Sequence, residues 1–348
     1  MKNFKNKKIL VTGHTGFKGS WLSKMLSFCG AEVVGLSNKI ENYHLCYKSL
    51  SKNVFHKEIF EDVINADFSK IIKEEQIDFI FYLAAQALVP NSFQNPHKTV
   101  LSNVAGASNF LQSLLNIDSN IVIVFVTSDK VYENNEWIYG YRENDKLGGI
   151  DPYSASKTAV EILIRSYYEC FLRKKNNISF GIARAGNVIG GGDFSPGRII
   201  PDAIKAIQKN NSLFVKNPDA TRPWQHVLEP LSGYINLAQR LKSNDLNGEA
   251  FNFGPNLKDN LSVLNLLQLL QKNLPDLSFR TVKSNSPIIE HKLLYLDTTK
   301  SQKILDWKTK MTLDKCVAWL ADWYRAFLNN PELIEDIMEE QIKSYWSL

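Results

Sequence analysis

Three glycines at a fixed spacing follow the first apolar segment of the chain. Residues 8–12 (KILVT) predict a β-strand, and the sequence then runs through Gly13-x-x-Gly16-x-x-Gly19 into a segment with helical periodicity. Glycines allow a tight turn there, and the following helix N-terminus offers N–H groups, so the loop is suited to bind a pyrophosphate. A purely structural glycine turn is the alternative. The position between strand and helix favours the phosphate site.

Apolar runs and helical segments alternate through the first half of the chain. Strands are predicted over 32–36, 79–83, 121–127 and 178–184, and helices over 21–28, 103–115 and 154–171. The runs FIFYL and IVIVFVT are typical of parallel strands buried on both faces. The last helix follows Asp151-Pro152, a good N-cap and first-turn pair. The pattern predicts an α/β fold with a Rossmann-like, doubly wound parallel sheet.

After residue 186 this alternation ends. Glycine-containing loops occupy 190–192 and 195–197, one more short strand is predicted at 251–253, and a helix at 316–327. We therefore predict a smaller, discontinuous C-terminal substrate domain. The predicted dinucleotide-binding domain comprises residues 1–186 and approximately 227–254, and the substrate domain comprises 187–226 and 255–348.

Composition excludes several other classes of protein. The 348 residues include 41 Lys and Arg against 36 Asp and Glu, a net charge of +5 that is not clustered, so no nucleic-acid partner is expected. No apolar run approaches the roughly 18 residues of a membrane span, so we expect a cytoplasmic protein without a membrane contact. Cys29, Cys46, Cys170 and Cys316 lie too far apart for a zinc motif. We expect reduced, buried thiols and no metal.

Tyr153 and Lys157 form a Y-x-x-x-K pair at the start of the helix predicted over 154–171. Residues at i and i+4 share one helix face, and an ammonium beside a phenol favours the phenolate. The pair is therefore expected to lower the pKa of Tyr153 and make it a general base. Spacing alone would also fit a surface tyrosine and a solvated lysine.

A hydroxyl, an acid and a base follow the strand predicted over 121–127, in the tripeptide Ser128-Asp129-Lys130. Ligands of doubly wound sheets bind beyond the carboxyl ends of the strands. The tripeptide is therefore predicted to lie beside the dinucleotide. Taken alone, an Asp-Lys turn on the surface would be the simpler interpretation.

Together, the glycine loop, Ser128, Tyr153 and Lys157 resemble the extended short-chain dehydrogenase/reductase family. The triplet Ser128-Asp129-Lys130 resembles its nucleotide-sugar 4,6-dehydratase branch, in the form of the members that act on CDP-glucose. Longer stretches resemble the same branch over nearly the whole chain: GHTGFKGSWL from Gly13, LAAQALV from Leu83, GYRENDKLGGIDPYSASK from Gly140, RAGNVIGGGDF from Arg184 and RPWQHVLEPLSGY from Arg222.

The resemblance implies NAD as cofactor and assigns roles to individual residues. The catalytic set is Ser128, Asp129, Lys130, Tyr153 and Lys157. The cofactor set is Gly13, Thr15, Gly16, Phe17, Lys18, Gly19, Asp62, Ala84, Ala85, Gln86, Asn103, Tyr153 and Lys157. The substrate set is Gln86, Asn187, Arg198 and Arg222; guanidinium groups also suit a diphosphate on chemical grounds. The second predicted strand ends in Ser37-Asn38-Lys39 without a carboxylate, which leaves NADP open.

The implied reaction converts CDP-glucose to a 4-keto-6-deoxy sugar and water, within deoxysugar and polysaccharide biosynthesis. Tyr153 would take the 4-OH proton, Asp129 would protonate the departing 6-OH, and Lys130 could take the C5 proton, although Tyr153 stays a candidate for that step. Hydride would pass from C4 to NAD and back to C6.

Three alternatives remain open: another nucleotide sugar, a 4-epimerase or 4-reductase, and a catalytically silent NAD(H) sensor. The Asp129-Lys130 pair argues against epimerase and reductase, because neither expels water. The resemblance also implies a homo-oligomer, a dimer built on the helices at 103–115 and 154–171 or a tetramer.

Overall fold

The computed structural model describes residues 4–243, 245–256, 260–282 and 293–348. These residues form a seven-stranded parallel sheet in the order β11-β6-β5-β4-β1-β2-β3. The strands are β1 (Lys8–Thr12), β2 (Glu32–Ser37), β3 (Lys57–Phe60), β4 (Phe79–Tyr82), β5 (Ile121–Val126), β6 (Ile178–Ala185) and β11 (Ala250–Phe253). The predicted doubly wound sheet is confirmed, and its order reverses between β1 and β4.

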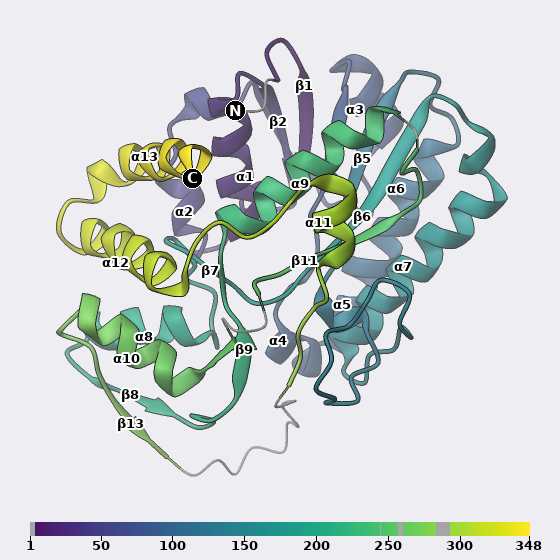
Figure 1. Cartoon of the computed structure of the whole chain (residues 1–348). Helices are drawn as coiled ribbons and strands as arrows, with labels where there is room; N and C mark the ends of the chain where they lie inside the picture. The colour runs from purple at the N-terminus through teal and green to yellow at the C-terminus, as the bar shows by residue number, and fades with distance from the viewer. Residues whose placement is uncertain (1–3, 244, 257–259, 283–292) are drawn as a thin grey trace.

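Helices cover both faces of this sheet (Figure 1). On one face, α1 (Phe17–Phe28) and α9 (Leu228–Arg240) pack with Ile9 and Val11. On the other, α3 (Phe68–Glu74), α6 (Gly106–Leu114) and α7 (Pro152–Cys170) pack with Leu10. Successive β1 side chains thus enter opposite cores, and burial on both faces explains why β4 and β5 are apolar at every position.

The C-terminal half adds helices and short strand pairs beside the carboxyl ends of the sheet. The helices are α8 (Ile199–Gln208), α10 (Val263–Asn273), α11 (Thr299–Leu305), α12 (Leu313–Asn329) and α13 (Ile334–Ser347). The strand pairs are β7 (Val188–Ile189) with β10 (Gln225–His226), β8 (Ser212–Val215) with β13 (Ser278–Thr281), and β9 (Thr221–Pro223) with β12 (Asn260–Ser262). Helix α13 returns to α1, where Lys24 Nζ lies 2.8 Å from Glu335 Oε1. The predicted division into two domains stays a prediction.

Three of the differences from the sequence-based prediction have a clear physical reason. Helix α1 begins at Phe17 rather than Trp21, because Gly19 packs inside its first turn instead of preceding the helix. The helix predicted over 103–115 begins as a π-helical turn, Leu101–Ala105, before α6. Strand β3 was missed, because this edge strand is only partly buried and has no continuous apolar run.

Two expectations from composition can be compared with the fold. In the part of the chain that the structure describes, no helix has the length and apolar character needed to cross a bilayer. All four cysteines are free thiols. Cys29, Cys46 and Cys316 are buried as expected, but Cys170 is exposed at the end of α7, so the expectation was wrong there.

Candidate active site

The glycine loop forms a tight backbone cradle between β1 and α1. Gly13 has φ +73°, a conformation that side-chain-bearing residues rarely adopt. A Cβ on Gly19 would lie 2.1 Å from the Gly13 carbonyl oxygen, so only glycine allows this approach. Gly16 is the N-cap of α1 and offers no side chain to cap its first N–H groups. The cradle therefore fits a pyrophosphate, which can accept those hydrogen bonds.

The loop meets the carboxyl ends of the neighbouring strands at the point where the strand order reverses. Thr15 Oγ1 donates to Ser37 Oγ (3.2 Å) at the end of β2. Thr12 Oγ1 accepts from the backbone N–H groups of Leu83 and Ala84, both at 3.0 Å, after β4. Dinucleotides bind at such a switch point, so the residues present fit NAD.

Asp62 follows β3 and lies beside the end of β2. Its Oδ2 accepts a hydrogen bond from Asn38 Nδ2 at 3.4 Å, and its Oδ1 accepts from the backbone N–H of Ile64 at 3.1 Å. The structure therefore brings Asp62, the carboxylate of the predicted cofactor set, next to Asn38, which follows a strand end that lacks an acid of its own.

Asn103 holds the backbone of Gln86, the last residue of the predicted cofactor segment 84–86. Its Oδ1 accepts from Gln86 N (2.7 Å), and its Nδ2 donates to Gln86 O (3.1 Å) and to Ser156 Oγ (2.8 Å). The Gln86 side chain also bonds within the chain, to Thr99 Oγ1 at 3.0 Å and to the Leu88 backbone. Asn103 thus positions the backbone of the predicted cofactor segment and ties it to α7.

Tyr153 and Lys157 lie buried on the first turns of α7, whose N-cap Asp151 accepts from Ser154 N at 3.0 Å. Burial raises the pKa of Tyr153 to about 12, against a hydrogen bond with Ser128 that lowers it. This direction is opposite to the one expected from the Lys157 ammonium, because desolvation of the phenolate dominates. Burial also lowers the pKa of Lys157 to about 8, and the Glu161 carboxylate opposes that shift.

Asp129 is a buried acid beside this tyrosine. Ser128 Oγ donates to Asp129 Oδ1 at 3.0 Å and accepts from Lys130 N at 3.2 Å. Asp129 Oδ2 is buried and has no hydrogen-bond partner among the described residues. Burial raises the pKa of Asp129, although Lys130, Ser128, Lys18 and Arg222 act in the lowering direction. The site therefore shifts Asp129 toward its protonated form and leaves its Oδ2 without a partner among the described residues.

Basic side chains surround Asp129 from several elements. Burial, followed by the charge of Arg198, lowers the pKa of Lys18 to about 8, and Asp129 opposes this shift. Arg198 Nη1 donates to Asp193 Oδ2 at 2.8 Å. Arg222 Nη1 donates to Thr221 O at 2.7 Å, and its charge reaches Asp129. Lys18, which we had placed in the cofactor set, thus belongs to the same charged cluster as Asp129 and Arg198.

Asn187 lies half-buried just after β6, where its backbone carbonyl accepts from Gln225 N at 3.3 Å. It therefore lies on the segment that leads from β6 to β7. His226, which we did not place in the site, is fully buried between Trp21 and Trp319, and burial lowers its pKa to about 3. That surrounding is consistent with a structural histidine.

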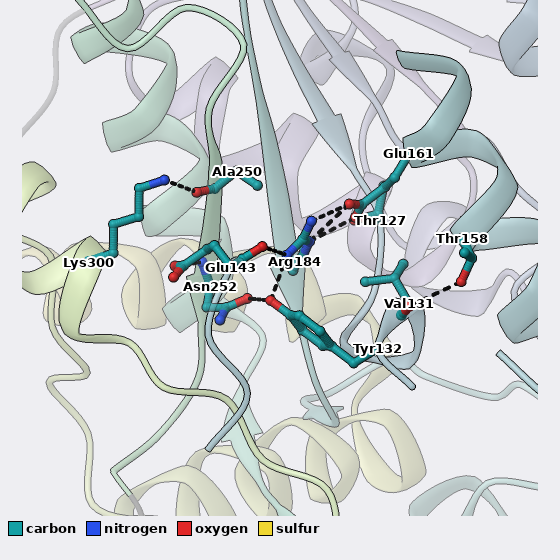
Figure 2. A network of polar contacts seen from close by, with 10 residues as sticks. All are labelled: Thr127, Val131, Tyr132, Glu143, Thr158, Glu161, Arg184, Ala250, Asn252 and Lys300. Atoms are coloured by element: carbon teal, nitrogen blue, oxygen red, sulfur yellow. Dashed lines mark hydrogen bonds and ion pairs between the residues drawn. The ribbon is translucent and has the colours of Figure 1, made fainter. Parts of the chain in front are cut away.

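Sequence reasoning missed a buried polar group directly behind the site. Glu161 contacts both Thr127, the residue before Ser128, and Arg184 (Figure 2). Two signals were available: Glu161 lies at i+4 from Lys157, and Arg184 is a charged residue within the strand predicted over 178–184. A charge within a fully buried strand requires a partner.

Comparison with known proteins points in one direction. The family model described as GDP-mannose 4,6 dehydratase matches residues 10–319. CDP-glucose 4,6-dehydratase from Salmonella typhimurium is 36% identical over 343 residues, which cover 96% of this chain and 95% of that protein.

Solved structures share the fold. UDP-glucuronic acid 4-epimerase from Bacillus cereus, in complex with UDP-glucuronic acid and NAD, superposes with a TM-score of 0.78 at 24% identity, covering 92% of this chain and 99% of that one. UDP-glucose-4-epimerase from Stenotrophomonas maltophila, with bound NAD, gives a TM-score of 0.80 at 20% identity, covering 93% and 99%.

Proposed function

This chain belongs to the GDP-mannose 4,6 dehydratase family, and we propose that it is a nucleotide-sugar 4,6-dehydratase that converts CDP-glucose to CDP-4-keto-6-deoxyglucose and water. The 36% identity to a CDP-glucose 4,6-dehydratase over nearly the whole of both chains supports the substrate. The runner-up function is a 4-epimerase, which the fold of the solved structures would also accommodate.

One observation favours dehydration over epimerisation: the buried Asp129 beside Tyr153. Ser128 bonds to both side chains, so the acid and the phenol lie at one point of the site. An epimerase needs only to remove and return hydrogen at C4. A dehydratase must also protonate a leaving hydroxyl, which a carboxyl with a raised pKa and an available oxygen can do.

The residues divide the reaction into two parts. When bound, NAD would take a hydride from C4 and return it to C6. Tyr153 would accept the 4-OH proton, with Ser128 as its hydrogen-bond partner and Lys157 one helical turn away. Lys130 would take the C5 proton, which the C4 ketone acidifies, and Asp129 would give its proton to the departing 6-OH. A proton that has exchanged with solvent would return to C5 when the hydride reaches C6. A buried phenol requires a nearby positive charge to ionise near neutral pH, because burial raises the pKa of Tyr153 to about 12 even though Ser128 and Arg198 act in the lowering direction.

The diphosphate would bind at the charged cluster around Asp129. Arg198 and Arg222 would supply guanidinium groups there, and Asn187 would supply an amide. Gln86 would have to exchange its present bonds to Thr99 and Leu88 to take part. Guanidinium forks form strong charge-assisted hydrogen bonds with phosphate oxygens. The charges of both arginines reach the catalytic side chains, Arg222 that of Asp129 and Arg198 that of Tyr153, so a diphosphate bound to them would place the sugar over this site.

A second copy of the chain would cover an apolar surface on α7 and its neighbours. Four apolar side chains there are exposed: Val100 of α5 (Pro96–Val100) at 45%, Leu101 at 40%, Ile162 of α7 at 58%, and Phe171, which follows α7, at 52%. Helix α5 and the π-helical turn both pack on α7, so these side chains gather on neighbouring elements. We therefore propose a homodimer through this face, and a cytoplasmic role in deoxysugar and polysaccharide biosynthesis follows from the same family likeness.

Incubation of the purified chain with CDP-, dTDP-, GDP- and UDP-sugars in deuterated water tests the function. CDP-glucose should lose one water, gain solvent deuterium at C5 and carry its original C4 hydrogen at C6, without net NADH. A product of unchanged mass with inverted C4 would establish the epimerase instead, and stoichiometric NADH would exclude both.

A further inference from the structure

A buried ion pair lies directly behind the catalytic residues. Glu161 is on α7, one turn after Lys157, and Arg184 is on β6; they are 3% and 4% exposed. Arg184 Nε donates to both carboxylate oxygens of Glu161, at 2.9 and 3.0 Å, and Nη2 also contacts Oε2. Buried ion pairs add little net stability relative to apolar side chains of similar volume. Stability alone therefore does not account for this pair.

The pair holds the catalytic tripeptide on both sides. Thr127, which precedes Ser128, donates from Oγ1 to Glu161 Oε1 at 2.6 Å. Tyr132, two residues after Lys130, accepts from Arg184 Nη1 at 2.7 Å and donates to Asn252 Oδ1 at 2.8 Å. Figure 2 shows Arg184 between Glu161 and Tyr132. The segment that carries Ser128, Asp129 and Lys130 is thus anchored at its start and at its end.

A third contact joins the same segment to α7. Val131 O accepts from Thr158 Oγ1 at 3.1 Å and from Gly148 N at 2.8 Å. Thr158 directly follows Lys157 in the helix. The network therefore couples the two segments that carry the proposed acid and bases, which otherwise come from separate elements.

The pair also acts on Lys157 electrostatically. The Glu161 carboxylate raises the pKa of Lys157 against the effect of burial. The Lys18 ammonium of α1 also interacts with Lys157. Because both groups are positive, each disfavours the charged form of the other. Tyr153 shares the helix face one turn before. Glu161 is therefore the carboxylate that favours the charged form of Lys157.

We propose that Glu161, held by Arg184, is a positioning residue of the dehydratase site: through Thr127 it sets the tripeptide Ser128–Lys130 against α7, and its carboxylate lies one helical turn after Lys157. This role rests on the proposed function, because it names the residue that assembles that same site. Glu161 is not among the residues proposed to touch the reacting atoms or the diphosphate.

Glu161→Gln tests the electrostatic half without relying on turnover. In protein labelled with ¹³C-lysine, the Lys157 resonance is identified by its loss in Lys157→Met, and its pKa is titrated. We expect the pKa of Lys157 to fall below the wild-type value in Glu161→Gln. The matched control is Glu169→Gln, the same change at an exposed site on α7 where Glu169 pairs with Arg173 at 3.0 Å. That control should leave the pKa of Lys157 unchanged.

Turnover tests the positioning half. Glu161→Gln should lower kcat about 10²-fold, as a misplacement near 1 Å does, with an unchanged KM for CDP-glucose. Thr127→Val, which keeps every charge, should lower kcat in the same direction, and Thr127→Ser should restore it. If Glu161→Gln does not fold, the two Thr127 variants carry the test.

The outcomes separate this proposal from the proposed function. Wild-type protein that leaves CDP-glucose unchanged would refute the function, while the titration would still report on Glu161. An unchanged Lys157 pKa in folded Glu161→Gln, or equal kcat in Thr127→Val and wild type, would show that the pair has only a structural role.

Discussion

Replacement of Gly19 by alanine should separate the two demands on α1, helix stability and cofactor binding. A Cβ there would lie 2.1 Å from Gly13 O and 2.8 Å from both Gly13 C and His14 Cα, all backbone atoms. Reaching even a 3.0 Å contact requires a displacement of 3.0 − 2.1 = 0.9 Å between loop and helix. A hydrogen bond of about 2.9 Å stretched by that amount exceeds about 3.5 Å and is lost.

The expected loss of affinity follows from this displacement. Hydrogen bonds to charged groups contribute about 1.5–3 kcal/mol, so losing one pyrophosphate contact should weaken NAD binding about 10–100-fold. Helix propensity alone predicts that the Gly19→Ala protein is more stable to unfolding than wild type, because alanine is favoured over glycine inside a helix by roughly 1 kcal/mol. The two arguments therefore give different results for one variant.

Titration of NAD by tryptophan fluorescence, together with thermal unfolding, measures both quantities. The control is Gly254→Ala, because the atoms nearest to its added Cβ belong to flexible side chains of Leu296 and Thr298 at 3.5 Å or more. That variant should keep the wild-type Kd for NAD. A Gly19→Ala protein with wild-type Kd, or with a raised Tm, would refute the cradle geometry.

Three further predictions concern the chemistry. Tyr153→Phe should abolish C4 oxidation. Lys130→Met should still show transient 340 nm absorbance in a single turnover but exchange no C5 hydrogen, and its rate of dehydration should fall about 10²–10⁴-fold. Dehydration by Lys130→Met at the wild-type rate would exclude Lys130 as the C5 base. The pKa of Asp129 is raised, and its protonated form is the proposed proton donor, so water loss should slow as pH rises through that pKa. Asp129→Asn should lack this limb of the pH–rate profile. If the limb persists in the variant, it belongs to another group. Arg222→Ala should raise the KM for CDP-glucose about 10–100-fold with little change in kcat, while Arg280→Ala, at an exposed position of β13, should not; a change confined to kcat would remove Arg222 from ground-state phosphate binding.

The sheet was predictable because its central strands report burial on both faces. Every residue of β5 and β6 is buried, so the apolar runs in the sequence match the strands closely. Strand β3 gave no such signal, since an edge strand leaves part of its side chains in solvent. The start of α1 was misplaced because a glycine lowers helix propensity, and only the folded loop shows that Gly19 is required by the approach of Gly13 O.

Within the candidate site, short-range spacing was readable and long-range contact was not. The pair Tyr153 and Lys157 and the tripeptide from Ser128 follow from positions a few residues apart, and their neighbourhood follows from the carboxyl edge of a parallel sheet. The contact between Thr127 and Glu161 spans 34 residues, and the one between Glu161 and Arg184 spans 23. Such contacts depend on how α7 packs on β5 and β6, which no local pattern specifies.

Protonation was the least predictable property, because it depends on burial as well as on neighbours. The spacing of Tyr153 and Lys157 indicated a lowered phenol pKa, but the fold removes both side chains from water and shifts each toward its neutral form. The same desolvation raises the pKa of Asp129. One physical effect thus shifts the acid Asp129 toward its protonated form, which suits loss of water. The same effect opposes ionisation of the base Tyr153, so positive charge in the site must favour the phenolate. Lys157 can supply part of that positive charge from within the chain, because the Glu161 carboxylate favours the charged form of Lys157.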